Sequence, residues 1–175
     1  MVEIIPYLHR LYGHYPEGIW RSVLDVGPQT FAGTAILATV HAANSFSRLK
    51  LDVHALDITD EFKYIKDIIA PTVHFHVGDI YEFNQRKFDI VIASHVVEHT
   101  KEPIRFMRRL QELAKEFVII ACPWREYPLT SPDHEVTIDK GVTMEIGARD
   151  LKIYTNYSWG KMREVCMFWL PGKAR

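Results

Sequence analysis

The sequence has little cysteine, almost no net charge and no long apolar run. Its 175 residues carry a formal charge of −1, so charge indicates neither nucleic acid nor an acidic membrane surface as a partner. Both cysteines, Cys122 and Cys166, lie in apolar stretches, which predicts two buried thiols and no disulfide framework. No apolar run approaches the roughly 18 residues of a membrane span, and no signal-peptide pattern opens the chain. We therefore expect a cytoplasmic protein without membrane contact.

Internal repeats, low-complexity runs and linker-like stretches are also absent from the sequence. A chain of this length is expected to form one domain with a substantial core, here over residues 1–175. The composition, 47% hydrophobic and 25% charged, is typical of a globular protein.

Short apolar runs alternate with helical patterns along the chain. Apolar runs that end at turn-forming residues predict strands at residues 22–26, 51–56, 73–77, 88–93 and 117–122. Residues 150–157 and 163–170 alternate like the two strands of an antiparallel hairpin. The regular alternation of strand and helix predicts an α/β fold, in which helices cover both faces of a parallel sheet.

Helical spacing of apolar residues fills the intervals between these strands. The predicted helices lie at residues 1–12, 32–43, 61–69 and 141–148, and Pro103 opens another in the position that proline prefers. Thr59 or Asp60 is expected to cap the helix at 61–69.

Candidate functional residues follow the strands, because ligands of α/β sheets gather at the carboxyl ends of parallel strands. In Val23–Gly33 the first strand runs into a turn, with Asp25 near its end and Gly27 where the backbone must turn sharply. Asp57 follows the second strand, where nucleotide-binding folds place an acidic residue that holds ribose hydroxyls. The alternative for each residue is a helix cap or an ordinary turn position.

Two later strand ends carry similar candidates. Gly78 is followed by Asp79, whose carboxylate suits the exocyclic amine of adenine, and by Ile80, which suits the ring. The segment Ser94–His99 then places two histidines and a glutamate directly after the fourth strand. The alternatives are a turn aspartate and a set of residues that bracket a helix start.

Together these strand ends resemble those of the class I S-adenosylmethionine-dependent methyltransferases, over nearly the whole chain. The similar segments are Val23–Gly27, Leu56–Ile58, Val77–Ile80 and Phe88–His99. The last of them, with its Val-Glu-His, resembles the small-molecule subfamilies. The resemblance implies a Rossmann-like, doubly wound, seven-stranded and mostly parallel sheet with an antiparallel terminal hairpin. It also implies S-adenosylmethionine as the methyl donor.

The resemblance further implies contacts with the donor at individual positions. Asp25 and Gly27 match the start of the family's glycine-rich motif, which contacts the methionine part. Asp57 matches the acidic residue on the ribose hydroxyls, and Ile58 matches its hydrophobic neighbour. Asp79 and Ile80 match the contacts with adenine. Ser94 and His95 match the strand end that lines the sulfonium and the acceptor.

The glycine-rich motif itself departs from the family pattern. Pro28, Gln29 and Phe31 stand before Gly33, where the family usually continues with glycines. We expect a stiffer loop, in which the Gln29 amide contacts the donor and Phe31 narrows the pocket. The departure motivates one alternative, a non-catalytic member that uses the fold for binding.

Histidines are the predicted catalytic residues. A general base is needed only if the acceptor loses a proton as it attacks, and the imidazoles of His95, His99 and His134 titrate near neutrality. With Glu98, these histidines also offer ligands for one divalent ion. That arrangement is similar to the metal site of RNA-terminal 2′-O-methyltransferases, with His95 in place of a glutamate. Because the Glu-His pair is common in metal-free relatives, the prediction is that no metal is bound.

The predicted acceptor is a small molecule. A nucleic acid acceptor, with or without a metal ion, is the alternative, and it rests on a basic helix face formed by Arg105, Arg108, Arg109 and Lys115. Such a face is more often a solvated surface. A nicotinamide dehydrogenase is a further alternative, but the sequence contains no Gly-x-Gly-x-x-Gly. Nothing in the sequence indicates an oligomeric state.

Overall fold

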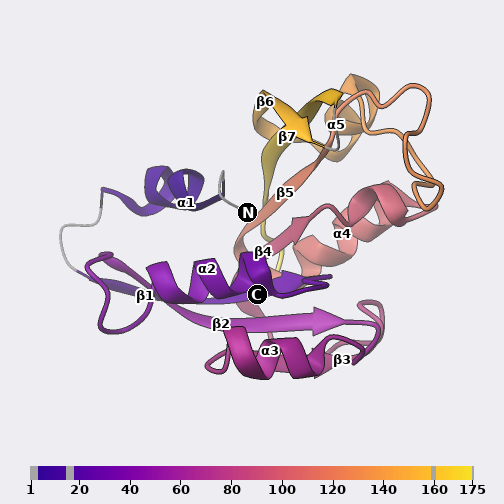
Figure 1. Cartoon of the computed structure of the whole chain (residues 1–175). Coiled ribbons are helices and arrows are strands. Elements are labelled where there is room, and N and C mark those ends of the chain that lie inside the picture. The colour runs from indigo at the N-terminus through magenta and orange to yellow at the C-terminus, as the bar shows by residue number, and fades with distance from the viewer. Residues whose placement is uncertain (1–3, 15–17, 159–160, 175) are drawn as a thin grey trace.

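A computed structural model describes residues 4–14, 18–158 and 161–174. Over these residues seven strands form one sheet in the order β3-β2-β1-β4-β5-β7-β6 (Figure 1). The strands are β1 (Ile19–Val26), β2 (Leu49–Asp57), β3 (His74–Val77), β4 (Phe88–Ser94), β5 (Ala114–Pro123), β6 (Arg149–Ser158) and β7 (Lys161–Pro171).

Strand directions confirm the predicted fold class. Strands β1 to β5 are parallel, whereas β7 runs antiparallel to both β5 and β6. In the sheet, β1 lies between β2 and β4, and the Ser22 hydroxyl donates to Asp89 Oδ2 at 2.9 Å across the β1–β4 pair. Part of the predicted hairpin turn, residues 159–160, lies outside the described residues.

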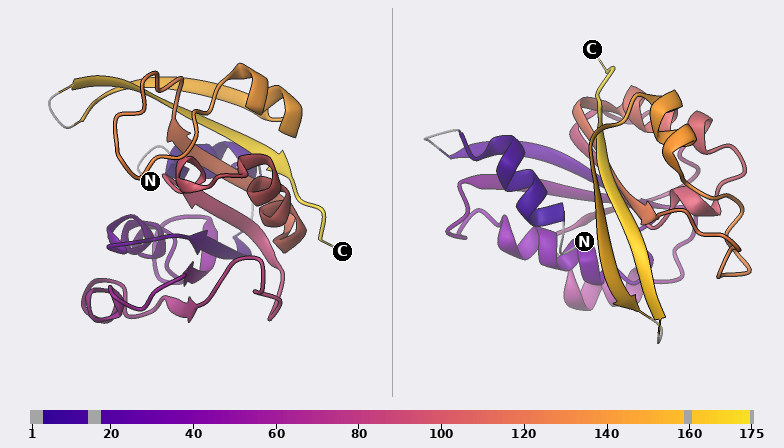
Figure 2. Two further views of the ribbon diagram at one scale, coloured as in Figure 1. Left: turned by 90° about the vertical axis from the view of Figure 1, so that its right-hand side faces the viewer. Right: turned by 90° about the horizontal axis from the view of Figure 1, so that it is seen from above.

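Helices cover the two faces of the sheet (Figure 2). Those on one face pack around Leu8 and Leu37, and those on the other around Met107 and Leu110. The first face carries α1 (Ile4–Tyr12) and α2 (Ala32–Val40), with α3 (Lys63–Ile69) beside α2, and the second carries α4 (Pro103–Leu113) and α5 (Lys140–Ile146). Within the described ranges, none of the helices combines the length and apolar character that a membrane crossing requires.

Successive side chains of a strand point to opposite faces of the sheet, which explains why a hydrophobic core lies on each face. In β4, Ile90 and Ile92 point to the α1–α2 side, and Val91 and Ala93 point to the α4 side. All four side chains are fully buried, as expected for a central parallel strand.

Several element boundaries differ from the sequence-based expectations: α2 ends at Val40, and β2 and β5 begin at Leu49 and Ala114. β1 begins at Ile19, three residues earlier than predicted, because Ile19, Trp20 and Arg21 already pair with β2 from Leu49 onward. The predicted cap of α3 is wrong: the helix begins at Lys63 without a side-chain cap. The Thr59 hydroxyl instead accepts from the Glu61 amide at 3.2 Å, within the turn that precedes the helix.

The cysteine prediction is confirmed. Cys122 and Cys166 face each other across the β5–β7 pair as free, fully buried thiols, with their sulfur atoms 3.5 Å apart.

Candidate functional site

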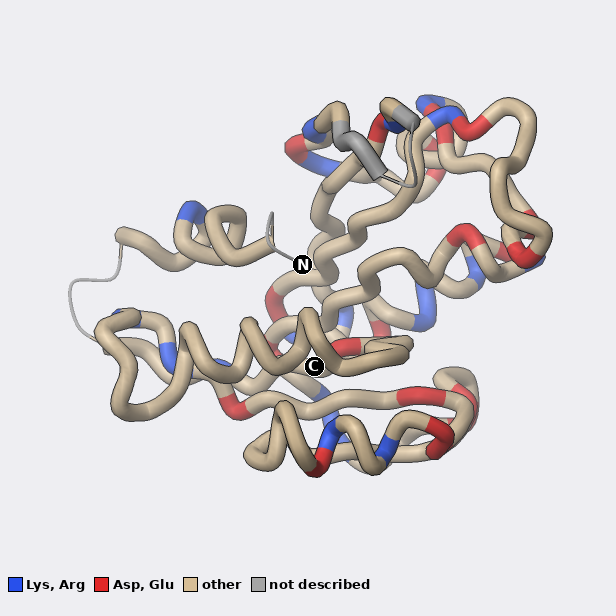
Figure 3. The backbone as a smooth tube through the Cα atoms, in the orientation of Figure 1, with Lys and Arg blue, Asp and Glu red and all other residues tan. Residues whose placement is uncertain are grey.

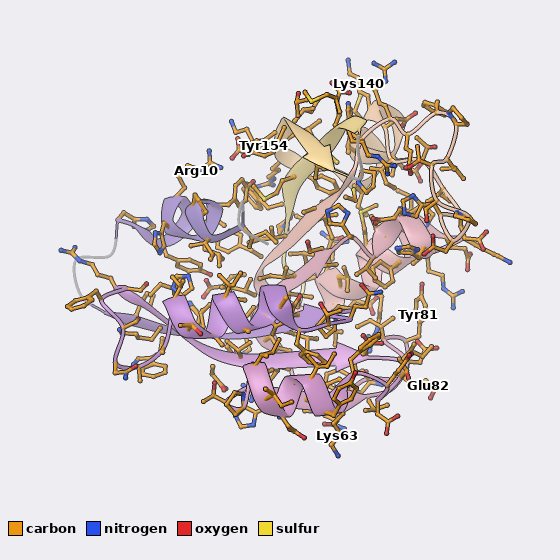
Figure 4. All side chains as sticks on the ribbon, viewed as in Figure 1. Arg10, Lys63, Tyr81, Glu82, Lys140 and Tyr154 are labelled. Atoms are coloured by element: carbon orange, nitrogen blue, oxygen red, sulfur yellow. The ribbon has the colours of Figure 1, made fainter. Side chains whose placement is uncertain are left out.

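A cavity of about 360 Å³ lies at the carboxyl ends of β1, β2 and β3. Figure 4 labels Tyr81, which contributes to its wall, and the neighbouring Glu82 at this edge of the sheet. The side chains and backbone that line the cavity are Val26, Gly27, Leu56, Asp57, Ile58, Gly78, Asp79, Ile80, Tyr81, Val96, His99, Thr100 and Phe106. The fold thus brings three separate strand ends into one wall.

Gly27 forms the sharp turn at the end of β1. Its φ of +66° lies in the left-handed region, and its amide donates to the Leu56 carbonyl at 2.8 Å. A Cβ at this position would lie 2.7 Å from Cγ2 of Val96, which follows β4. Both the dihedral and the space therefore require glycine.

Asp57 ends β2 with its carboxylate at the cavity. The carboxylate accepts from the amides of Gln29, at 3.4 Å, and Thr59, at 3.3 Å. Both contacts are long, so the two oxygens retain capacity for a ligand's hydroxyl groups. Beside Asp57, the exposed Ile58 and the buried Ile80 supply apolar wall.

Asp79 stands at the turn after β3. Its Oδ1 accepts from the Tyr81 amide at 2.8 Å, which fixes the turn, and the residue is exposed. The turn therefore holds Asp79 in the wall of the cavity next to Ile80.

Asp25 lies beneath this edge and not in the cavity wall. It is 2% exposed, and its Oδ2 accepts from the Thr34 hydroxyl at 2.6 Å. The bond ties the end of β1 to the first turn of α2. Burial raises the pKa of Asp25 to about 6, against the opposing effect of the Thr34 hydrogen bond.

The residues that replace the family's glycines adopt glycine-like backbone. Gln29 and Phe31 have φ values of 48° and 59°. This conformation turns the Phe31 ring into the core, where it is 1% exposed and meets Phe75 edge to face at a centroid distance of 5.0 Å. The expectation that Phe31 narrows the pocket is therefore corrected.

A histidine cluster lies beside the cavity. Its members come from the residues after β4, from the 3₁₀ turn η1 (Val97–His99) and from the loop between β5 and α5. His99 and His134 meet edge to face at a centroid distance of 4.9 Å, next to Glu98. His95 is half-exposed in a left-handed backbone conformation, with Nδ1 3.3 Å from Glu98 Oε1.

Comparison with known proteins identifies the fold. A family model described as a methyltransferase domain matches residues 24–121, more than half of the chain, from β1 through the cavity residues into β5. The chain belongs to this family, the class I S-adenosylmethionine-dependent methyltransferases. The predicted resemblance is confirmed. Sequence comparison with curated proteins gives no match.

Solved methyltransferase structures share the fold at low identity. DszA carbon methyltransferase has 20% identity and a TM-score of 0.66, over 98% of this chain and 53% of that one. Magnesium protoporphyrin IX methyltransferase from Synechocystis PCC 6803, with bound S-adenosylmethionine, has 15% identity and a TM-score of 0.66, over 96% of this chain and 77% of that one. Phosphoethanolamine N-methyltransferase 2 of Haemonchus contortus, with the same ligand, has 14% identity and a TM-score of 0.64, over 98% of this chain and 53% of that one. This methyltransferase thus spans about half the length of two of them.

The cavity of the methyltransferase gathers many, but not all, of the predicted site residues. Those in its wall are Gly27, Asp57, Ile58, Asp79, Ile80 and, among the histidines, His99. Gln29, Ser94 and His95 stand outside the wall formed by the described residues, as Asp25 does. His134 approaches only through His99.

Sequence reasoning missed several lining residues of the methyltransferase. Tyr81 and Phe106 belong to the turn after β3 and to α4, and only the folded chain brings both to the cavity wall. The position of Tyr81 directly after Ile80 was the one local signal. Val96 lies directly before the Val-Glu-His segment, yet its approach to Gly27 could not be read from either sequence neighbourhood.

The basic face of α4 is largely neutralised. Arg105 pairs with Glu102 at 2.8 Å. Lys115, predicted to lie on this helix face, belongs instead to β5, because α4 ends at Leu113, and it lies 3.5 Å from Asp89. Arg109 pairs with a glutamate and donates to backbone carbonyls. Within the described chain, Arg108 is the one member of this face without an ion pair. A hollow of about 730 Å³ beside α4 is lined by the ion pairs of Arg105 and Arg109, together with Arg108. The surface argument for nucleic acid is thereby weakened.

The raised pKa of Asp25 predicts a pH-dependent effect of Asp25→Asn. The folded pKa, about 6, exceeds the ordinary 3.8, so wild-type stability declines as pH rises through 6. Asparagine does not ionise. Relative to the wild type, the unfolding free energy of the variant should therefore increase by about 2 kcal/mol between pH 4 and pH 7. Urea unfolding across this range measures the difference, and a difference independent of pH would contradict the prediction.

Proposed function

We propose that this methyltransferase binds S-adenosylmethionine in the 360 Å³ cavity and transfers its methyl group to a small-molecule acceptor. The observation that carries the proposal is the joint placement of Gly27 and Asp57 in one cavity wall, at the ends of neighbouring parallel strands. We infer that residues 1–175 act as one methyltransferase domain.

The residues of the wall fit the parts of the donor. Asp57 suits the ribose hydroxyls, because a carboxylate accepts paired hydrogen bonds. Asp79, with Ile80 beside it, suits adenine, and the turn at Gly27 lets the methionine part approach the backbone closely. The volume lies within the range of about 300–1,000 Å³ common to small-molecule sites.

Charge at this edge also favours the donor. Acidic positions gather where β2 and β3 end (Figure 3), and they include Asp57, Asp60, Asp79 and Glu82. S-adenosylmethionine carries a positive sulfonium and a positive amine. An acidic edge attracts such a cation.

The bound donor supplies a methyl group that is already activated. The protein then contributes mainly proximity and orientation. The apolar wall, with Val96 and Phe106, excludes water from the reacting atoms. For acceptors that must lose a proton, His95, His99 and His134 are the proposed bases as long as no metal ion occupies their ring nitrogens, and His99 is the one in the cavity wall.

The burial of Phe31 supports a catalytic over a non-catalytic member. The altered motif was the motive for the non-catalytic alternative, but its large side chain leaves the cavity free. The ion pairs of α4 likewise favour a small acceptor over RNA.

Calorimetric titration of the whole chain with S-adenosylhomocysteine tests donor binding. We expect one site per chain, because one cavity joins the strand ends within the described residues. No detectable heat at high micromolar ligand would refute the proposal.

Transfer of labelled methyl from S-adenosylmethionine tests the acceptor class. With a deproteinised cell extract as the source of acceptors, we expect the label in the fraction that passes a small-pore filter. Label in acid-precipitable nucleic acid would instead support the RNA alternative, and donor binding without any transfer would support the non-catalytic one.

A further inference from the structure

Glu98 is a buried carboxylate without a hydrogen-bond donor. It is 1% exposed, and no group of the described residues donates a hydrogen bond to either of its oxygens. The imidazole of His95, which is half-exposed, approaches Oε1 at 3.3 Å without forming a hydrogen bond. A buried carboxylate in this state calls for a positive partner.

Two histidines face this carboxylate, and each is held by its Nδ1 nitrogen. Nδ1 of His99 lies 3.0 Å from the carbonyl oxygen of Asp133, which can only accept, so Nδ1 carries the proton. Nδ1 of His134 lies 2.5 Å from the Glu126 carboxylate, which also accepts. In the neutral rings the lone pair therefore sits on Nε2.

This pairing is the arrangement that metal-ligating histidines show. Such a ring usually donates its second N–H to a carboxylate or a backbone carbonyl, which fixes the tautomer and the orientation of the ring. Asp133 and Glu126 take these roles for His99 and His134. Among the residues that the structure describes, no hydrogen bond engages Nε2 of either ring.

We propose that Glu98, His99 and His134 bind a divalent first-row transition-metal ion. One potential ligand atom from each residue lies within 4.8 Å of the others, close enough for a single ion to reach all three. Two imidazoles and a carboxylate suit zinc, iron, cobalt or manganese better than calcium or magnesium. Three protein ligands leave coordination positions open.

A second cluster offers the same residue types but a different chemistry. Asp52, His54 and His74 also bring potential ligand atoms within 4.8 Å of one another. There, however, the Arg86 guanidinium donates to Nε2 of His54 at 3.0 Å and lies 3.5 Å from the Asp52 carboxylate. The arginine already supplies the positive charge and uses the imidazole lone pair, so this cluster serves as the comparison site.

The position of the proposed ion indicates an acceptor class. His99 lines the donor cavity, so an ion on His99 lies at the cavity's edge, with its open positions available to an acceptor oxygen. We infer an acceptor that presents a hydroxyl or carboxylate group. This last step rests on the proposed function, whereas ion binding itself does not.

The test is a metal titration of the whole chain after removal of bound metal with EDTA and dialysis. Calorimetry with Zn²⁺, and visible absorption with Co²⁺, should show one ion per chain. Glu98→Gln and His134→Ala should each weaken binding by about 100-fold or more. Glu126→Gln should weaken it by about 10-fold, because it acts through His134.

His74→Ala, in the second cluster, is the matched control and should leave the affinity unchanged. Loss of binding in His74→Ala with retention in His134→Ala would overturn the proposal, as would the absence of saturable binding to the wild type. His134 lies in a loop, so its variant decides the matter if Glu98→Gln does not fold. Titration with S-adenosylhomocysteine in metal-free buffer tests the donor site separately.

Discussion

Gly27→Ala is expected to weaken S-adenosylhomocysteine binding by about 100-fold. The new Cβ would lie 2.7 Å from Cγ2 of Val96. Because Val96 lines the cavity and its branched side chain has few alternative rotamers, relief of the clash moves it into the donor's space. The left-handed φ of +66° adds roughly 1–2 kcal/mol of backbone strain. Calorimetric titration measures the affinity, and denaturant unfolding measures the stability.

Gly147→Ala is the control that separates the loss of donor affinity from the loss of stability. Gly147 has a comparable φ of +76°, but a Cβ there meets nothing within 4 Å. It ends α5, outside the wall of the cavity. We expect this control to lose a similar amount of stability and to keep its donor affinity. Equal affinities in both variants would place the donor elsewhere.

Asp57→Ala is expected to reduce donor affinity by a similar factor, about 100-fold. Two hydrogen bonds from ribose hydroxyls to a carboxylate are each worth roughly 1.5–3 kcal/mol, part of which solvent at this half-exposed site offsets. The loss of the contacts from the Gln29 and Thr59 amides contributes little, because both are long. Titration with S-adenosylhomocysteine measures the change.

Two controls sharpen this result. Asp60→Ala removes an exposed carboxylate of the same acidic edge, so it tests general attraction and should change affinity by less than about threefold. An analogue of S-adenosylhomocysteine without ribose hydroxyls should bind wild type and Asp57→Ala equally weakly. If Asp57→Ala still discriminates between the two ligands, the carboxylate does not hold the ribose.

The strand ends were predictable because local pattern determines them. Gly27, Asp57 and Asp79 each follow an apolar run, and the carboxyl ends of parallel strands meet at one edge. No structure is needed to infer that such residues share a site. Composition and spacing were sufficient for this part of the site and for the α/β class.

The direction of individual side chains was not predictable in the same way. Asp25 and Phe31 are close in sequence to Gly27, which lines the cavity. The backbone nevertheless turns Asp25 toward Thr34 and Phe31 toward Phe75. A residue other than glycine in a left-handed conformation, such as Phe31, has no reliable sequence signal. The meeting of His99 with His134 likewise depends on the course of a long loop.

The pairing of β1 with β4 sets a condition on how the donor cavity forms. Ser22 and Asp89, which are hydrogen-bonded across this pair, are 67 residues apart. Forming the contact therefore costs the conformational entropy of closing a long loop. Gly27 and Asp57 come from the first two strands, but Val96 arrives only after β4 has docked between β1 and β5. The cavity is therefore a product of high contact order: a nascent chain that ends before β4 carries the donor's polar partners without a site to hold it.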